Sequence, residues 1–88
     1  MRVLVLYKPN SEHGRMVEEY VRDYQQAGHS GKIKLINVNT RDGSNTAVLY
    51  DVMEYPTILV TRIDGSIIRS WSGSTLPLQS DVASYVYA

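Results

Sequence analysis

The residues best suited to chemistry gather in one short stretch of the sequence, between Lys8 and Arg15. Lys8, His13 and Arg15 carry or can accept positive charge, and the stretch contains the expected start of an amphipathic helix. Unpaired backbone amides at a helix start attract anions, and nearby cationic side chains add to that attraction. These residues therefore predict a site for a carboxylate or a phosphate.

Ser11 lies in the middle of this stretch, but the sequence does not support a catalytic serine. A serine hydroxyl becomes a nucleophile only beside a base that a third group orients. His13 lies two residues away, a spacing at which side chains on a helix do not face each other. Because serine and asparagine are favoured helix N-caps, we expect Ser11 or Asn10 to cap the helix and no residue to be catalytic.

Neither metal nor sulfur chemistry is expected. His13 and His29 lack further ligands at metal-binding spacing, so both are predicted to be exposed polar side chains and no metal is predicted. The chain contains no cysteine, which excludes disulfides, thiolate catalysis, iron–sulfur clusters and cysteine-ligated zinc. Dithiol–disulfide oxidoreductase activity is excluded with them, and no cofactor is predicted.

The length and charge of the chain suggest a small soluble protein. Its 88 residues suit a single core, so residues 1–88 are predicted to form one domain. Nine basic and nine acidic residues leave a formal net charge of zero, which does not favour a nucleic-acid or membrane partner. The first apolar run, Val3 to Tyr7, is too short for a signal peptide or a membrane span. We expect a cytoplasmic protein that is a monomer or a weak dimer.

The first half of the chain predicts a strand, a helix and a second strand. The continuous apolar run from Val3 to Tyr7 is typical of a central strand covered on both faces. The sequence predicts a helix from about Ser11 to Gln26, with Gly28 as its C-terminal stop signal. Its apolar stripe comprises Met16, Val17, Tyr20, Val21 and Tyr24. Leu35 to Asn39 predicts the second strand, parallel to the first because a helix connects them.

The middle of the chain predicts a loop and a short helix, and the chain closes with another helix. The segment 40–45 is rich in turn-forming residues and predicts the loop, and the short helix is expected over residues 46–52. Its predicted buried stripe is Ala47, Val48, Leu49 and Val52. The closing helix is predicted after Pro77. Its apolar residues at helical spacing are Leu78, Val82, Tyr85 and Val86.

A β-hairpin is predicted between these two helices. Asp64-Gly65 is a strong turn signal between apolar segments 57–62 and 66–71. Strict alternation in the outer strand groups Ile67, Arg69 and Trp71 on one face and Ile68 and Ser70 on the other. Trp71 becomes an interface candidate if it is exposed, because large exposed aromatic residues are enriched at binding hot spots. In chain order the elements are β-α-β-α-β-β-α, which predicts an α/β fold with a four-stranded mixed sheet and helices on both faces.

Two motifs add a family resemblance to this order. Tyr55-Pro56-Thr57 opens an apolar strand at its first residue, where proline is tolerated, and resembles the proline–threonine pair of the thioredoxin-like superfamily. The segment from Tyr7 to Gly14 resembles the glutaredoxin loop Tyr-(x)-Lys-Pro-x-Cys-x-x-Cys, with Ser11 and Gly14 at the two cysteine positions. The resemblance implies a glutaredoxin-like minimal thioredoxin fold and a cis peptide bond before Pro56.

With both cysteines absent, the resemblance implies a redox-inactive binding module. Members of the superfamily bind an extended segment beside this proline through main-chain hydrogen bonds, a form of β-strand addition. We therefore expect a peptide, a protein or a small anionic ligand in the groove between the helix start and the Pro56 loop. The predicted ligand-binding residues are Tyr7, Lys8, Asn10, Ser11, His13, Arg15, Tyr55, Pro56 and Thr57.

Two alternatives follow from the same resemblance. The first is a glutathione-binding or glutathione-dependent enzyme that uses the thiol of the ligand, with Tyr7 or Ser11 donating a hydrogen bond to it. Lys8 then matches the family's carboxylate-binding lysine, and Gly73-Ser74 is the nearest match to its diglycine. The second alternative is that Ser11 replaces a nucleophilic cysteine. Gly14 stands at the second cysteine position and argues against the loss of a dithiol, so the replaced group would be a single thiol.

Overall fold

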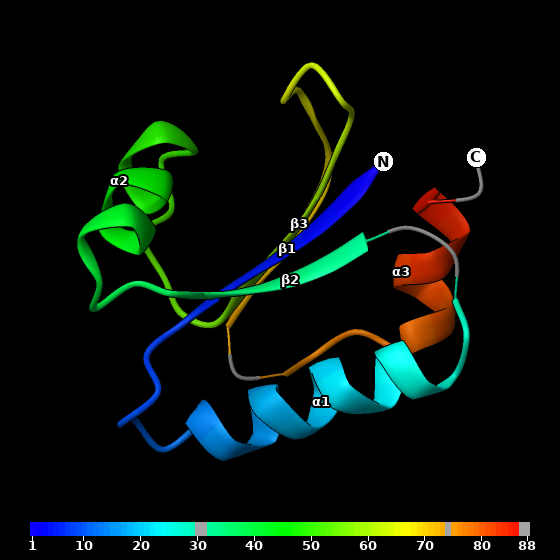
Figure 1. The fold of residues 1–88 in the computed structure, drawn as a ribbon, viewed down its shortest axis with the longest axis horizontal. Helices are drawn as coiled ribbons and strands as arrows, with labels where there is room; N and C mark the ends of the chain where they lie inside the picture. The colour runs from blue at the N-terminus through cyan, green and yellow to red at the C-terminus, as the bar shows by residue number, and fades with distance from the viewer. Residues whose placement is uncertain (30–31, 74, 87–88) are drawn as a thin grey trace.

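The computed structural model describes residues 1–29, 32–73 and 75–86. Along these residues the helices and strands follow the predicted order β-α-β-α-β-β-α (Figure 1). They are β1 (Arg2–Tyr7), α1 (Gly14–Gln26), β2 (Lys32–Asn37), α2 (Arg41–Leu49), β3 (Thr57–Thr61), β4 (Ile67–Ser72) and α3 (Gln79–Val86). The prediction of an α/β fold with a four-stranded mixed sheet is confirmed.

The sheet has the strand order β2-β1-β3-β4, so β1 and β3 are central and β2 and β4 are edge strands. β1 pairs in parallel with β2 and antiparallel with β3, and β3 pairs antiparallel with β4. Val3 and Val5 are buried on one face of β1, and Leu4 and Leu6 are buried on the other. This burial on both faces explains why the strand is a continuous apolar run in the sequence.

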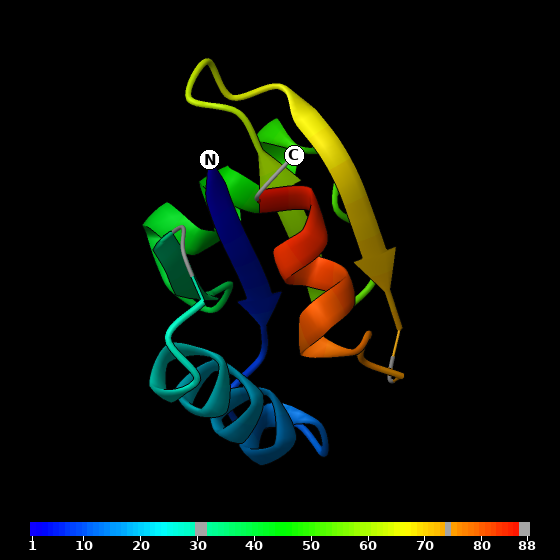
Figure 2. The same cartoon turned by 90° about the vertical axis from the view of Figure 1, so that its right-hand side faces the viewer.

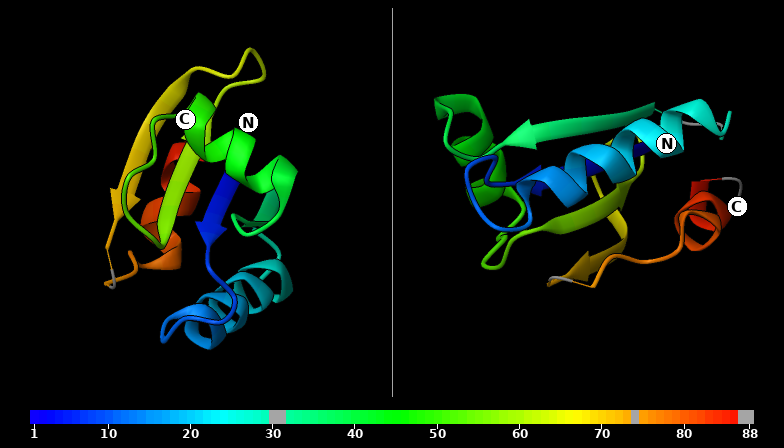
Figure 3. Two further views of the ribbon diagram at one scale, coloured as in Figure 1. Left: turned by 90° about the vertical axis from the view of Figure 1, so that its left-hand side faces the viewer. Right: turned by 90° about the horizontal axis from the view of Figure 1, so that it is seen from below.

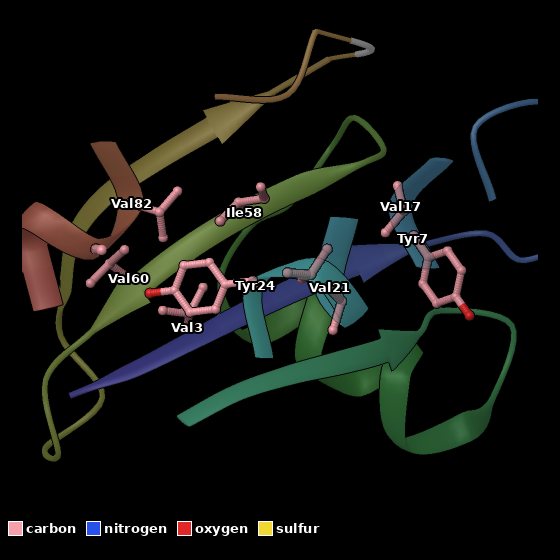
Figure 4. Close-up of a cluster of buried hydrophobic side chains, with 10 residues drawn as sticks. Val3, Tyr7, Val17, Val21, Tyr24, Ile58, Val60 and Val82 are labelled. Atoms are coloured by element: carbon pink, nitrogen blue, oxygen red, sulfur yellow. The ribbon is translucent and has the colours of Figure 1, made fainter. Parts of the chain in front are cut away.

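Helices cover both faces of the sheet (Figures 2 and 3). α1 and α3 pack against one face in the larger core cluster. Figure 4 labels eight of its residues: Val3, Tyr7, Val17, Val21, Tyr24, Ile58, Val60 and Val82. α2 packs against the other face, where Ala47 lies in a smaller cluster with residues of β1, β2 and β3. α1 has 13 residues, and no helix among the described residues is long and apolar enough to cross a membrane.

α2 begins earlier than the sequence predicts. The side chain of Thr40 accepts a hydrogen bond from the Gly43 amide at 3.0 Å and caps a helix that starts at Arg41. The predicted loop over 40–45 is therefore wrong, because a cap outweighs the turn propensity of the residues after it. Val48 and Leu49 are 78% and 76% exposed, so the prediction that they are buried is also wrong.

Two further element boundaries differ from the predictions. β2 covers Lys32–Asn37 because its pairing with β1 starts where Arg2 meets Lys32. Leu78 lies just before α3 and is 70% exposed. Its carbonyl accepts hydrogen bonds from the amides of the first helical turn, so Leu78 marks the helix start and does not belong to its buried stripe.

A β-bulge changes which residues of β4 share a face. The register between β3 and β4 shifts after Val60 and leaves Ile68 as the extra residue. Ile68 therefore packs with Trp71 against the core beneath α1 and α3, and Ile67 lies on the α2 side of the sheet. The predicted grouping of Ile67 with Trp71 is wrong. Trp71 is half-buried, with its ring 5.6 Å from that of Tyr85, so it is not an exposed interface residue.

Candidate functional site

The loop between β1 and α1 is closed by a turn, and its serine does not cap the helix. α1 starts at Gly14 after an N-cap at His13 that makes no side-chain capping bond. The Ser11 hydroxyl instead donates to the Lys8 carbonyl at 2.6 Å, and the Ser11 amide donates to the same oxygen at 3.2 Å. The predicted N-cap at Ser11 or Asn10 is wrong, because the loop completes a turn before the helix begins.

The two histidines are half-buried rather than exposed. The Nε2 atom of His13 accepts a hydrogen bond from the Lys8 amide at 3.4 Å. The ring of His29 lies 4.7 Å from that of Tyr24. His13 therefore contacts the loop backbone through its side chain.

Gly14 is required by a close backbone approach. It is buried, and a Cβ atom at this position would collide with the Pro9 carbonyl and lie 3.2 Å from the Lys8 carbonyl oxygen. Only glycine allows the two backbone segments to approach this closely. A cysteine at this position would force the loop to shift.

The Tyr7 side chain belongs to the core rather than to an open surface. Tyr7 is 5% exposed, and its hydroxyl donates to Oε2 of Glu18 at 2.9 Å. Burial, followed by the hydrogen bond and the negative charge of Glu18, raises the pKa of Tyr7 to about 12. The phenol stays protonated at neutral pH with its proton directed at Glu18. No sequence signal identifies this partner, because Glu18 lies on the polar face of the helical pattern.

Lys8 and Tyr55 bring two distant segments of the sequence together. The Nζ atom of Lys8 lies 5.2 Å from the centroid of the Tyr55 ring, within the range of a cation–π contact. Tyr55 is half-buried against the core cluster under α2, and its peptide bond to Pro56 is cis, as the resemblance implies. The loop after β1 and the segment before β3 therefore meet at this pair.

The segment before β3 is a tightly held corner in which the backbone amide and carbonyl of Tyr55 are left unpaired among the described residues. The buried Thr57 hydroxyl donates to the Glu54 carbonyl at 2.6 Å, and the Pro56 carbonyl accepts from the Gly73 amide at 3.1 Å. Neither the amide nor the carbonyl of Tyr55 forms a hydrogen bond with the described residues. Backbone groups of this kind are available to an incoming chain.

Arg15 and Asn10 take no part in this contact. The Arg15 side chain is 91% exposed and lies 3.9 Å from Glu19 one helical turn away, a pairing that contributes little at such exposure. Asn10 is exposed, and its side chain makes no hydrogen bond with the described residues. Lys8, His13 and Arg15 therefore each have a different contact, and the structure does not join their side chains in one anion site.

Two further expectations concern the match to the family's diglycine and the binding of a metal ion. Gly73 follows β4 with a positive φ of 103°, and Ser74 beside it lies outside the described residues. Within residues 1–29, 32–73 and 75–86, no three histidine, aspartate or glutamate side chains gather closely enough to hold a metal ion.

Comparison with known proteins supports the fold and does not extend to function. No protein-family model and no curated protein matches the chain. Among solved structures, the chain is similar to one described as "Structure of a malarial protein", with a TM-score of 0.73 and 13% sequence identity. The similarity covers 97% of this chain and 91% of that chain. At this level of identity, the two proteins share a fold, and no family is assigned from the match.

Proposed function

We propose that this protein is a redox-inactive, thioredoxin-like binding module that holds an extended acidic peptide segment between the loop after β1 and the corner before β3. The observation that carries the proposal is the unpaired backbone amide and carbonyl of Tyr55, whose side chain lies beside the exposed Lys8. An extended chain can pair with these two groups through its own backbone, as strands do when they add to a sheet.

The charge of Lys8 favours a ligand that places a carboxylate beside it. Lys8 forms no ion pair with the described residues, and its ammonium group is held over the Tyr55 ring. A carboxylate of the bound segment would gain a charge-assisted hydrogen bond from Lys8. The corner is already ordered by the hydrogen bonds of Thr57 and Pro56, so binding requires little further ordering of the protein.

The glutathione alternative has less support from the site geometry. Tyr7 and Ser11 are its two candidate donors to a ligand thiolate. The Tyr7 hydroxyl already donates to Glu18, and the Ser11 hydroxyl already donates to the Lys8 carbonyl. A thiolate at this site would have to displace one of these acceptors.

An amide NMR titration of nitrogen-labelled protein tests the proposal. The probe is an acetylated hexapeptide of alternating glutamate and valine, compared with its lysine–valine counterpart and with a version N-methylated on alternate amides. We expect only the unmethylated acidic peptide to shift amides in 8–14 and 54–57. Lys8→Ala should weaken its binding about tenfold, the size of one charge-assisted contact. Arg22→Ala, on the exposed side of α1, should leave it unchanged.

Three results would contradict peptide binding at this site. They are equal shifts with the basic peptide, insensitivity to N-methylation, or tight binding by the Lys8→Ala protein. Reduced glutathione and S-methylglutathione form a separate arm. A clear preference for the free thiol would favour the glutathione alternative.

A further inference from the structure

The α2 side of the sheet is only partly covered. α2 spans Arg41–Leu49, and the surface beside it exposes large apolar side chains. Val48, Leu49 and Met53 are 78%, 76% and 82% exposed, and Ile67 of β4 is also exposed on this side. Figure 3 shows α2 lying across this face of the sheet. A surface that exposes several large apolar groups close together is typical of an interaction site.

One side of this face is basic. A hollow of about 750 Å³ lies along the β2 edge of the sheet and reaches both α1 and α2, and its cationic lining residues are Arg2, Lys32 and Lys34. The parallel register places Arg2 opposite Lys32, and Lys34 follows on the same face. No aspartate or glutamate lines this hollow. Like charges placed directly opposite each other on neighbouring strands are destabilising unless an anion approaches them.

The other side of the same face is acidic. Two smaller hollows of about 380 and 270 Å³ lie beyond Tyr50, towards β4, and Asp51, Glu54 and Asp64 are their charged lining residues. No lysine or arginine lines either one. Leu49 and Tyr50 border hollows on both sides, so they form an apolar ridge between a basic half and an acidic half.

None of these six charges is neutralised by an ion pair within the described residues. Asp64 accepts hydrogen bonds from the amide and the hydroxyl of Ser66. These hydrogen bonds, together with the positive charge of nearby Arg62, hold the pKa of Asp64 below its ordinary value. Asp64 is therefore negatively charged at neutral pH. The face carries basic, apolar and acidic zones in that order.

We propose that a second copy of this chain docks on the α2 face, with a two-fold axis along the ridge of Leu49 and Tyr50. A two-fold axis in the plane of an interface places each half of one face against the other half of its partner. The basic half of each copy then faces the acidic half of the other, so the same contact forms twice in the dimer. The two ridges cover each other. The pattern is complementary to itself, which is why a second copy fits it better than an unrelated partner.

Two charge-reversal variants and their mixture test this arrangement by sedimentation over the micromolar to millimolar range. The first is Lys32→Glu with Lys34→Glu. The second is Asp51→Asn with Glu54→Lys, in which asparagine suits the positive φ of 55° at Asp51. Each variant alone should dimerise at least about tenfold more weakly than the parent protein, because like charges then face each other twice. An equal mixture should recover dimers, because the two variants complement each other at both contacts.

The ridge is tested separately with matched leucine substitutions. Leu49→Ser should weaken dimerisation, whereas Leu78→Ser, at a leucine that is also largely exposed but lies away from this face, should not. Arg22→Glu on α1 controls for a general charge effect. A parent protein that stays monomeric at millimolar concentration would overturn the proposal, and so would a mixture that fails to recover dimers. Amide shifts at Lys32 and Lys34 with a polyanion such as heparin, in a protein that stays monomeric, would assign the basic half to a different, acidic partner.

Discussion

At the residue scale, the behaviour of Ser11 depends on where α1 begins. The glutaredoxin resemblance places Ser11 at the position of a cysteine that a helix start would activate. In this structure the helix starts at Gly14, and the Ser11 side chain turns back to the Lys8 carbonyl. The stabilising effect of a helix terminus falls off within one turn, so position 11 gains little from it.

Replacing the serine with cysteine measures this effect directly. In a Ser11→Cys protein we expect the thiol to titrate near its ordinary pKa of about 8.5, because it lies before the helix cap at His13. Thiolate absorbance against pH gives the value, with the urea-unfolded protein as the reference. A folded-state pKa below about 7, the range of activated cysteines, would contradict this placement of the helix start.

The raised pKa of Tyr7 predicts that the protein loses stability at high pH. Its pKa is raised from 10.0 to about 12 by burial and by Glu18, and burial also raises the pKa of Tyr20 to about 12. The folded protein therefore holds these protons more tightly than the unfolded chain. The resulting stabilisation is present below about pH 10 and is lost as the pH rises towards about 12.

A Tyr7→Phe variant isolates the contribution of this residue. At neutral pH we expect it to be less stable by roughly 0.5–1.5 kcal/mol, the net value of one hydrogen bond. Above pH 10, the ordinary pKa of tyrosine, its free energy of unfolding should fall less steeply than that of the parent protein. Urea unfolding at a series of pH values measures both effects. Parallel pH profiles for the two proteins would show that Tyr7 does not titrate with folding.

At the element scale, α2 shows how a single cap can extend a helix into a segment rich in turn formers. Thr40 Oγ1 accepts from the Gly43 amide and also donates to the Asn37 carbonyl at 2.7 Å. This hydroxyl therefore joins the end of β2 to the start of α2. Gly43 is needed at the same place, because a Cβ there would collide with the Asn37 carbonyl.

Removal of this hydroxyl should destabilise the protein. We expect Thr40→Ala to lower the free energy of unfolding by about 1 kcal/mol, with an upper value of about 2 kcal/mol for a cap in a well-packed site. The matched control is Thr46→Ala, whose hydroxyl bonds back to the Asp42 carbonyl within the same helix at 3.0 Å and should change stability by less than about 0.5 kcal/mol. Chemical denaturation compares the two, and equal effects would argue against the cap.

At the scale of the whole molecule, stability depends on a sheet buried on both faces. β1 and β3 are central, and their side chains enter the core cluster under α1 and α3 or the one under α2. Ile58 is fully buried in the larger cluster, whereas Ile63, in the turn after β3, is 83% exposed. The two isoleucines therefore differ in environment but allow the same substitution.

Paired substitutions test this difference. Ile58→Val should cost roughly 0.5–1.5 kcal/mol of stability, because it leaves a space that packed neighbours fill only in part. Ile63→Val should stay within about 0.5 kcal/mol of the parent protein. Urea denaturation of both variants gives the comparison. A similar loss at both positions would mean that Ile58 is not in a tightly packed core.

The sequence by itself determined the order of elements and the layered fold, because local patterns carry that information. The apolar run at Val3 to Tyr7, the helical stripe before Gly28 and the turn at Asp64-Gly65 each predict an element found close to its expected place. Helix starts were predicted less well. Caps such as Thr40 act through single hydrogen bonds that compete with the propensities of the residues after them.

Only the tertiary structure decided what the candidate site looks like, because its contacts join residues that are distant in the sequence. The contact of Lys8 with Tyr55 and the hydrogen bond from Tyr7 to Glu18 depend on how β1, α1 and β3 pack together. The requirement for Gly14 comes from the backbone of the preceding loop. Residue types and spacing could suggest which side chains take part, but the distances between them are set by the packing of the whole chain.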